Sequence, residues 1–495
     1  MFKTVTPEQA GISSREVSRF INYLNDNSLR IHSLLLIRDD KMFTEAYWKP
    51  FNKDFCHRQY SQTKSFVGVA IGLLISDGLL SLDDKISKFF GDKIDDVDSA
   101  SHYLLNQTIE QMLTMSTVGE GKIWLREKAY DRTHLYFNNR PYVKMPGALW
   151  EYDSPGSQIL SCLVEKVTGM SIFEFLNSRI FSQLGTFKNA KMLKTPNGDT
   201  WGDSAMICTP RDMASFAKLI MDNGNYQGKS LINEDYVKTA TSKVVDNSEV
   251  KLGSVFGNGY GYQIWRAPRD GYAFVGMGGQ ITVTIPSKRL IFVINSDTQG
   301  NASAYDIIVN GFISFIVDRI ADTPLLPDAN AYLKLAEQIN HLELFALKGI
   351  DNNELKDMLN GQTYICDANN LGITKFKFTF NENGGEFAYT NEQGDKVIPF
   401  GVNKNAFGKF PQLGYSKEFG GVPTSDGHTY NDAVSLRFTK KNKIQMLVQI
   451  IDEYFGTILA TFAFVDNEVA CKFVPAAEYF LREYDGYFIA RAQNE

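Results

Sequence analysis

A serine and a lysine three positions apart are the residues of this sequence best suited to covalent chemistry. Residues 60–66 read Tyr-Ser-Gln-Thr-Lys-Ser-Phe, so that Ser61 precedes Lys64 by three positions. On the first turn of a helix this spacing places both side chains on one face. The serine oxygen then lies at the positive end of the helix dipole, where a developing oxyanion is stabilised. The lysine can accept the serine proton if burial or a neighbouring group keeps it neutral.

The context of this pair separates it from two further pairs with the same spacing. These recur at Ser215/Lys218 and Ser248/Lys251. The first recurrence falls inside a predicted helix, where the hydroxyl would turn toward the helix itself. The second lies in a polar loop with no apolar helix behind it. Only Ser61/Lys64 opens a buried helix that follows two strands, so we interpret Ser61 as the nucleophile.

Hydrophobic periodicity predicts the elements that must position this pair. A capping box at 13–16 opens an amphipathic helix, residues 31–37 and 42–48 read as strands, and an apolar helix follows from about 61 to 77. Strands return at 259–265, 272–275, 281–285 and 290–294, and the stretch from about 83 to 224 is mainly helical. The first part of the chain is therefore expected to be α/β (α+β), with a helical insertion between its early and late strands.

The chain changes character near residue 323, where two prolines interrupt a short segment. Beyond it the hydrophobic period becomes two, as in Phe-Lys-Phe-Thr-Phe at 376–380. We expect residues 1–322 to form the first domain, 323–360 a linker and helical connector, and 361–495 an all-β domain. The last of these reads as an antiparallel meander closed into a barrel or sandwich.

The charge balance argues against two classes of partner. The chain has 51 Lys and Arg against 57 Asp and Glu, a formal net charge of −6. Nucleic acids and anionic membranes bind clustered positive charge instead. The longest apolar stretch, residues 66–75, is about half of the roughly 20 residues that span a bilayer. With no secretory signal in the first residues, we expect a cytoplasmic protein with no nucleic-acid or membrane partner.

Cysteines and histidines are not spaced for a metal site or a disulfide framework. The five cysteines are scattered without a C-x-x-C pair, and the six histidines show no H-x-x-x-H. We therefore expect reduced thiols, no metal and no cofactor. Aromatic residues make up 13% of the chain, which favours large aromatic cores over an aromatic binding groove.

Two later segments could complete a site around Ser61. Residues 146–156 read Pro-Gly-Ala-Leu-Trp-Glu-Tyr-Asp-Ser-Pro-Gly, a turn that enters a helix, and Tyr152 could project from it into a cleft. The alternative is a buried tyrosine whose hydroxyl bonds to backbone. Residues 275–280 read Val-Gly-Met-Gly-Gly-Gln, and their glycines could let a substrate backbone approach a strand edge. The alternative there is an ordinary turn.

The ordered set of motifs resembles a known family. An S-x-x-K at a helix start, Tyr-Asp-Ser after Pro-Gly, and a glycine-rich strand resemble serine hydrolases related to class C β-lactamases and penicillin-binding DD-peptidases. The esterase and nylon-oligomer-hydrolase branch is the most similar. Further matching segments are 7–13, 77–84, 112–116 and 167–169, so that the resemblance spans about residues 5–300. The C-terminal meander resembles the lipocalin-like barrels that some members carry.

The resemblance implies an antiparallel sheet flanked by helices and a role for each motif. Ser61 would be the acyl-accepting nucleophile, and Lys64 and Tyr152 would share the acid and base roles. The residues implied to bind substrate or the oxyanion are Ser154, Gly278, Gly279 and Gln280. In that arrangement the N–H of Ser61 and that of Gly279 or Gln280 form the oxyanion hole. The implied activity is hydrolysis of an ester or amide of a small molecule or short peptide.

Two departures from the family pattern argue against β-lactams and D-Ala-D-Ala as natural substrates. Ser154 stands where the β-lactamases have asparagine, and it is too short for bidentate bonding to an amide. Gly-Met-Gly at 276–278 replaces Lys-Thr-Gly, which removes the cation that grips a carboxylate. Arg266 or Arg269 could substitute for that cation, or both could be solvated loop charges.

Other functions stay open at this point. An α/β-hydrolase needs G-x-S-x-G, and residues 202–206, Gly-Asp-Ser-Ala-Met, lack the final glycine. A different class would be a non-turnover acyl-binding sensor that is acylated once and signals through the C-terminal domain. A weak β-lactamase is a third alternative. The sequence leaves the oligomeric state open.

Overall fold

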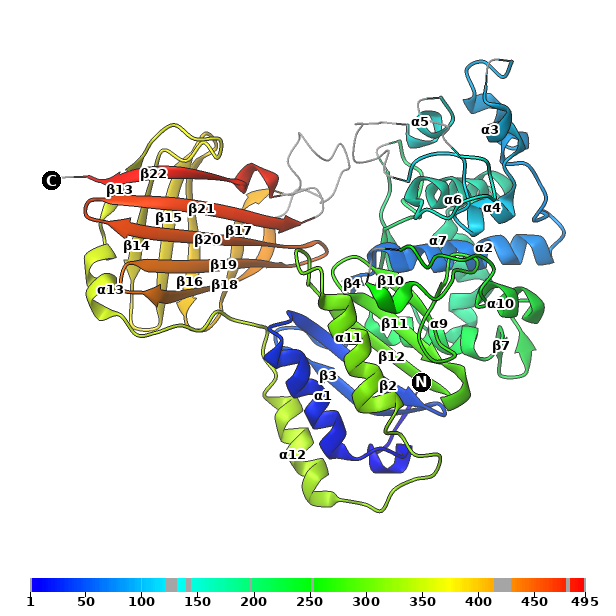
Figure 1. Ribbon diagram of the computed structural model, residues 1–495, viewed down its shortest axis with the longest axis horizontal. Helices are drawn as coiled ribbons and strands as arrows, with labels where there is room; N and C mark the ends of the chain where they lie inside the picture. The colour runs from blue at the N-terminus through cyan, green and yellow to red at the C-terminus, as the bar shows by residue number, and fades with distance from the viewer. Residues whose placement is uncertain are drawn as a thin grey trace. The chain divides into compact units, whose positions relative to one another are not determined.

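The chain forms two compact units in the computed structural model, Met1–Glu343 and Leu344–Glu495. The structure describes residues 2–98, 100–121, 131–138, 144–195, 197–250, 253–413, 429–477 and 481–493. Figure 1 shows the elements of both units, and each unit is described by itself.

A mixed sheet forms the centre of the first unit, in the order β1-β3-β2-β12-β11-β10-β9. Its strands are β1 (Lys3–Thr4), β2 (Ile31–Arg38), β3 (Lys41–Tyr47), β9 (Trp265–Arg266), β10 (Tyr272–Gly276), β11 (Gln280–Ile285) and β12 (Leu290–Ser296). The pair β1–β3 is parallel and the other neighbours are antiparallel. Because β2 pairs with β12, the N-terminal hairpin and the late strands join in one sheet, as the family resemblance implied.

Helices pack on both faces of this sheet, because successive residues of a strand point to opposite sides. Leu34 and Leu36 of β2 share a core with α1 (Ser14–Asp26), α11 (Ala304–Phe312) and α12 (Ala329–Asn340). Leu35 and Ile37 share the other core with α2 (Thr63–Ser76) and α9 (Pro210–Met221). This two-sided burial explains why residues 31–37 read as an unbroken apolar run.

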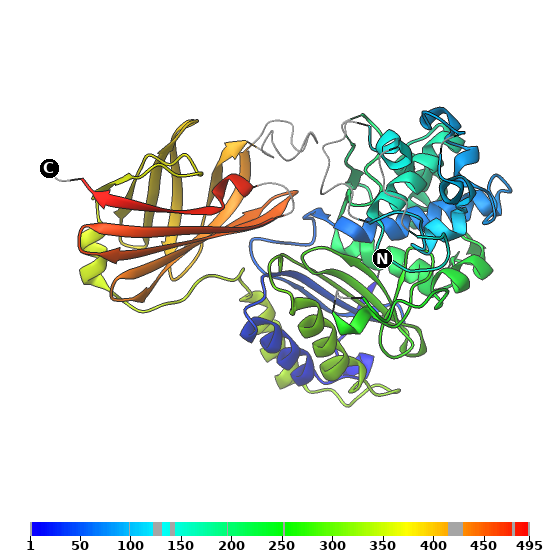
Figure 2. The same ribbon diagram turned by 45° about the horizontal axis from the view of Figure 1, so that its top comes forward.

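The predicted insertion is present as a set of short helices around α2 (Figure 2). Its helices include α3 (His102–Asn106), α4 (Ile109–Leu113), α5 (Arg132–Asn138), α6 (Ser154–Thr168), α7 (Ile172–Leu176) and α8 (Ser182–Leu184), and α10 (Glu234–Ala240) follows beyond the predicted end of the insertion at about residue 224. Short turns of helix lie at Glu8–Ala10, Tyr60–Gln62, Ile86–Lys88, Gly91–Lys93, Asn177–Phe181, Ser254–Phe256, Pro286–Lys288 and Ile313–Val317. Small sheets are formed by β4 (His57–Arg58), β6 (Met206–Cys208) and β5 (Lys191–Met192), and by β7 (Asn225–Tyr226) and β8 (Lys229–Ser230).

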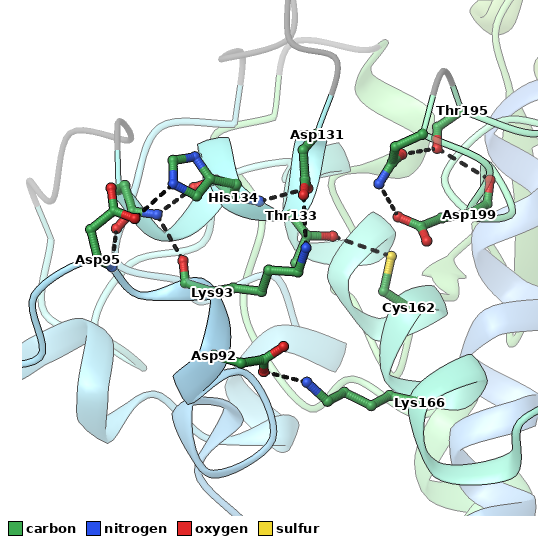
Figure 3. A network of polar contacts seen from close by, with 12 residues as sticks. Asp92, Lys93, Asp95, Asp131, Thr133, His134, Cys162, Lys166, Thr195 and Asp199 are labelled. Carbon is green, nitrogen blue, oxygen red and sulfur yellow. Dashed lines mark hydrogen bonds and ion pairs between the residues drawn. The ribbon is translucent and has the colours of Figure 1, made fainter.

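Polar contacts link the segments of this insertion (Figure 3). Lys93 Nζ lies 2.8 Å from a carboxylate oxygen of Asp131, and this hydrogen bond raises the pKa of Lys93. His134 Nε2 lies 2.9 Å from Asp95 in the same group. These contacts join the segment before α3 to α5, so we read them as structural.

The second unit is a barrel. Its elements are α13 (Asn353–Leu359), β13 (Thr363–Cys366), β14 (Lys375–Phe380), β15 (Gly384–Asn391), β16 (Gly394–Val402), β17 (Ala406–Leu413), β18 (Thr429–Lys440), β19 (Lys443–Ile451), β20 (Phe455–Val465), β21 (Glu468–Ala477), a turn of helix at Arg482–Tyr484 and β22 (Gly486–Ala492). A pairing of β16 with β18 at Val402 and Leu436 closes nine of the described strands into a ring, and β17 pairs with β18 beside it. The predicted barrel is confirmed.

Phenylalanine rings fill the barrel interior. Phe376, Phe378 and Phe387 each lie within 5.6 Å of Phe462, measured between ring centroids. The alternation of residues 376–380 therefore places its aromatic side inward, with the lysine and threonine outward. In this unit the aromatic residues therefore form a packed core.

Three sequence predictions differ from the structure in detail. The strand predicted at 259–265 is reduced to β9, with only isolated bridges at Tyr260. The helix predicted from residue 61 is α2 preceded by a separate turn at Tyr60–Gln62. The segment 323–360 contributes α12 to the first unit and α13 to the second.

Within the described residues, no helix combines the length and the apolar character needed to cross a membrane. The same residues contain no group of three or more histidine, cysteine or acidic side chains that could hold a metal ion. All five cysteines are free thiols.

Candidate active site

Ser61 lies in a strained turn between a short strand and a buried helix. β4 pairs with β6, the turn Tyr60–Gln62 follows, and α2 begins at Thr63. Tyr60 has a φ of +46°, a left-handed conformation that costs a residue other than glycine about 1–3 kcal/mol. Ser61 is half-buried, whereas every residue of α2 up to Leu74 is buried. The turn thus holds the hydroxyl at the edge of a rigid core.

Lys64 is held between the nucleophile and a main-chain carbonyl. Its side chain is nearly enclosed, with 2% of the residue exposed. Nζ donates to Ser61 Oγ at 3.0 Å and to the carbonyl oxygen of Asp203 at 2.6 Å. A buried amine requires such acceptors, because leaving it unbonded in an apolar interior is costly. The predicted pair is therefore in contact, in a geometry that allows proton exchange.

Tyr152 is the third predicted catalytic residue, and it lies beside Lys64. The centroid of its ring is 5.1 Å from Lys64 Nζ. The ring also stacks on Trp265 with a centroid separation of 5.6 Å and an interplanar angle of 22°. Tyr152 is half-buried, so it is not the enclosed structural tyrosine of the alternative reading. The structure brings all three predicted catalytic residues together.

The start of α6 places Tyr152 in this position. Asp153 is the N-cap of α6 and accepts a hydrogen bond from the N–H of Gly156 at 3.0 Å. Its carboxylate also accepts from Thr117 Oγ1 at 2.5 Å. Proline at 155 favours the first turn of the helix. The Asp-Ser-Pro-Gly sequence therefore fixes where the helix begins, and the tyrosine immediately before it.

The end of β10 approaches the chain beside Ser61 through a glycine. A Cβ atom on Gly276 would lie 2.2 Å from the carbonyl oxygen of Gln59, so only glycine permits this contact. β9 pairs only with Tyr272 and Ala273, which leaves the end of β10 without that strand partner. Tyr305 Oη donates to the Gly276 carbonyl at 2.9 Å and holds this end of the strand.

The predicted substrate-binding residues occupy different places. Gly278 and Gly279 form the turn between β10 and β11 with φ of +73° and +84°. Gln280 begins β11 and is fully buried, and its Nε2 donates to the Met277 carbonyl at 3.1 Å. Ser154 is the first residue of α6 and is half-buried. The oxyanion roles of these residues stay predictions.

Ser215 and Lys218 bond to other partners, unlike Ser61 and Lys64. Ser215 Oγ donates to the Arg211 carbonyl at 2.9 Å, which is the turn toward the helix expected from the sequence. Lys218 pairs with Asp40 at 2.9 Å. Ser248 Oγ donates to Asp246 Oδ2 at 2.6 Å, and its partner Lys251 lies outside the described residues.

Neither arginine considered as a substitute cation is free for that role. Arg269 forms an ion pair with Asp318 at 2.8 Å. Arg266 donates to the carbonyl oxygens of Thr241 at 2.7 Å and Asp270 at 3.1 Å.

Sequence reasoning missed two parts of the site. The carbonyl of Asp203 is a main-chain group, so no residue type signals its role. Trp265 begins the short strand β9, and its ring belongs to an aromatic cluster with Trp150, Tyr152, Phe256 and Tyr260. In the sequence, only the run of aromatic and glycine residues at 256–265 could have indicated this cluster.

Comparison with known proteins identifies a family and relatives. The model of the beta-lactamase family matches residues 22–308, which include Ser61, Lys64 and Tyr152. The 6-aminohexanoate-dimer hydrolase of Paenarthrobacter ureafaciens is 21% identical over 222 residues, 42% of this chain and 56% of that protein. An uncharacterized protein of Alkalihalophilus pseudofirmus is 23% identical over 236 residues, 42% of this chain and 64% of that protein. The matched region thus spans less than two thirds of either relative.

Solved structures share the fold. A candidate 6-aminohexanoate-dimer hydrolase from Bacillus anthracis is 20% identical with a TM-score of 0.53, covering 64% of this chain and 86% of that one. SurE with D-Leu is 15% identical with a TM-score of 0.50, covering 91% of this chain and 94% of that one. At these identities the likeness concerns the fold alone.

Proposed function

Because the chain belongs to the beta-lactamase family, we propose that it is a serine hydrolase. It cleaves an ester or amide bond of a small molecule or short peptide through an acyl-enzyme intermediate on Ser61. The observation that carries the proposal is the 3.0 Å contact between Lys64 Nζ and Ser61 Oγ, with the ring of Tyr152 beside the lysine.

The proposed reaction uses these three side chains in two stages. Ser61 Oγ attacks the carbonyl carbon while its proton passes to the Lys64 amine or through Tyr152. The alcohol or amine takes up a proton as its bond to the carbonyl carbon breaks. Water then attacks the acyl-serine ester, the carboxylic acid departs, and Ser61 regains its proton. The N–H groups of Ser61 and of Gly279 or Gln280 are the proposed donors to the oxyanion.

The substrate class follows from what the site retains and lacks. The departures at Ser154 and at 276–278 remove groups that β-lactamases use, and the engagement of Arg266 and Arg269 supports the view that neither replaces the lost cation. The relative from Paenarthrobacter ureafaciens is a 6-aminohexanoate-dimer hydrolase. Linear esters and amides, and not β-lactams, are therefore the proposed substrates.

Replacement of Ser61 tests the proposal. Ser61→Ala is expected to abolish labelling by a fluorophosphonate and to lower hydrolysis of a chromogenic short-chain ester about 10³-fold or more. Ser215→Ala and Ser248→Ala are the matched controls and should behave as the parent. Parental activity in the Ser61 variant would remove the assignment.

The same ester assay separates turnover from a sensor. An enzyme releases product in a steady phase after any initial burst. A single stoichiometric burst with no steady phase would instead support an acyl-binding protein, with Ser61 acylated once.

A further inference from the structure

Arg58 is a fully buried arginine three residues before the nucleophile. It lies in β4, with 0% of the residue exposed. Burying a guanidinium is unfavourable unless its donors are bonded and its faces are packed. The described contacts of the Arg58 side chain therefore indicate its role.

One set of contacts holds the loop that supports Lys64. Arg58 Nε donates to the carbonyl of Ser204 at 3.1 Å, and a terminal nitrogen donates to Ser204 Oγ at 3.3 Å. The peptide that precedes Ser204 carries the Asp203 carbonyl that accepts from Lys64 Nζ at 2.6 Å. Ser204 is thus the residue between the guanidinium and the acceptor of the lysine.

This loop is not held by strand pairing at that point. β6 begins at Met206, where the N–H donates to Thr63 Oγ1 at 2.9 Å and the carbonyl accepts from Gln59 N–H at 2.8 Å. Asp203 and Ser204 lie before the strand, in a turn. Within that turn the N–H of Ser204 donates to the Trp201 carbonyl at 3.3 Å, and the side chain of Arg58 adds its contacts with Ser204.

The other set of contacts is with two aromatic rings, one of them directly before Ser61. The guanidinium carbon is 4.4 Å from the ring centroid of Tyr60, the left-handed residue directly before Ser61. It is also 4.6 Å from the ring of Trp201, two residues before Asp203. A single planar group thus contacts both the segment that carries Ser61 and the segment that carries Asp203, the acceptor of Lys64.

We propose that Arg58 is a positioning residue for the Ser61–Lys64 pair. Its guanidinium fixes the Asp203–Ser204 peptide against Lys64 and packs on Tyr60 to hold the turn that presents Ser61. The inference rests on the proposed function, since it assigns Arg58 to the reaction of Ser61. Lysine cannot replace it fully, because an ammonium has no planar fork that bonds two oxygens while stacking between two rings.

The test measures the reactivity of Ser61 in the full chain. The rate of fluorophosphonate labelling is followed from pH 5 to pH 10 for the parent, Arg58→Met and Arg58→Lys, together with kcat and KM for a chromogenic ester. Arg58→Met should label about 100-fold more slowly, because Ser61 and Lys64 would no longer be held in the reactive geometry. The loss should appear in kcat with KM little changed, and the pH of half-maximal labelling should move. Arg58→Lys should fall between the parent and Arg58→Met.

Arg38→Met is the matched control for removing a buried arginine. Arg38 is 8% exposed and donates to the main-chain carbonyls of Ala10 and Ala321, away from the three catalytic residues. This variant should melt at a lower temperature yet label at the parental rate. A comparable loss in Arg38→Met would mean that Arg58 acts only through stability.

The remaining outcomes are decisive. A folded Arg58→Met that labels within about threefold of the parent overturns the inference. If Arg58→Met does not fold, Arg58→Lys decides, and parental labelling by that folded variant overturns the inference equally. A parent chain whose Ser61 takes no label contradicts the proposed function itself, and the mass of the Ser61 peptide shows this independently of Arg58.

Discussion

At the scale of single residues, the site depends on where one phenol and one amine lie relative to a hydroxyl. Lys64 reaches Ser61 from the next turn of the same segment, whereas Tyr152 comes from the start of α6. The phenol ring is held by its stack on Trp265 and by its position over the lysine. Its hydroxyl can therefore be removed without moving the ring.

Tyr152→Phe is expected to lower turnover about 100-fold or more, because a positioned acid or base contributes 10²-fold or more. The measurement is kcat for a chromogenic ester. Tyr260→Phe is the matched control, since Tyr260 belongs to the same aromatic cluster and burial raises the pKa of its phenol well above the usual value. Turnover by Tyr152→Phe within about threefold of the parent would show that the shared-proton mechanism is wrong.

At the scale of elements, the two units differ in how they bury polar groups. In the first unit the buried Lys64 and Arg58 bond to main-chain carbonyls at the site. In the barrel, Asp432 of β18 is enclosed in the wall. Burial raises the pKa of its carboxyl to about 7, and the N–H of Gly408 and the charge of Lys409 offset this only in part.

The raised pKa of Asp432 predicts a pH-dependent stability. The folded state binds this proton more tightly than the unfolded chain, in which the pKa is about 3.9. The contribution of Asp432 is therefore fully present below about pH 4 and is lost as pH rises to about 7 and beyond, a difference of about 4 kcal/mol. Asp432→Asn should resist urea more than the parent at pH 8, and the two should converge near pH 4.

A matched variant removes an exposed carboxylate from another strand of the barrel. Glu386→Gln in β15 should show no such divergence between pH 4 and pH 8. Equal pH dependence in the parent and Asp432→Asn would contradict the assignment of this carboxyl.

At the scale of the whole molecule, all the proposed catalytic residues belong to the first of the two units. Ser61, Lys64, Tyr152 and Asp203 all lie in Met1–Glu343. α12 belongs to that unit as well, since Gln338 accepts a hydrogen bond from Ser18 of α1 at 2.6 Å and Leu335 is buried in the core beneath the sheet.

Truncation at two places tests this division. A chain ending after Glu343 should fold and label on Ser61, because every described contact of the reactive pair is kept. A chain ending after Pro327 loses α12 and uncovers the core beside α1, so its melting temperature should be lower. The measurements are thermal unfolding and fluorophosphonate labelling. Loss of labelling in the chain that ends after Glu343 would mean that the barrel contributes to the site. An altered substrate preference in that chain would mean that the barrel contributes to substrate binding.

Local sequence was enough to predict several parts of this protein. The N-cap at Ser13 and the spacing of Val17, Phe20 and Leu24 predict α1, because capping and helical period act within a few residues. The contact of Ser61 with Lys64 was predictable for the same reason, since both lie within one turn of chain. The two-residue period of 376–380 likewise gave the inward face of the barrel.

What the sequence determined by itself is therefore the contact between Ser61 and Lys64, the family and the main elements. Tertiary structure alone decided the acceptor of Lys64, which is a main-chain carbonyl 139 residues away along the chain. It also limited the strand predicted at 259–265 to β9, and it set Arg58 between two segments of the site. Such contacts depend on distant segments meeting in space, and a main-chain oxygen or a ring face leaves no periodic mark in the sequence.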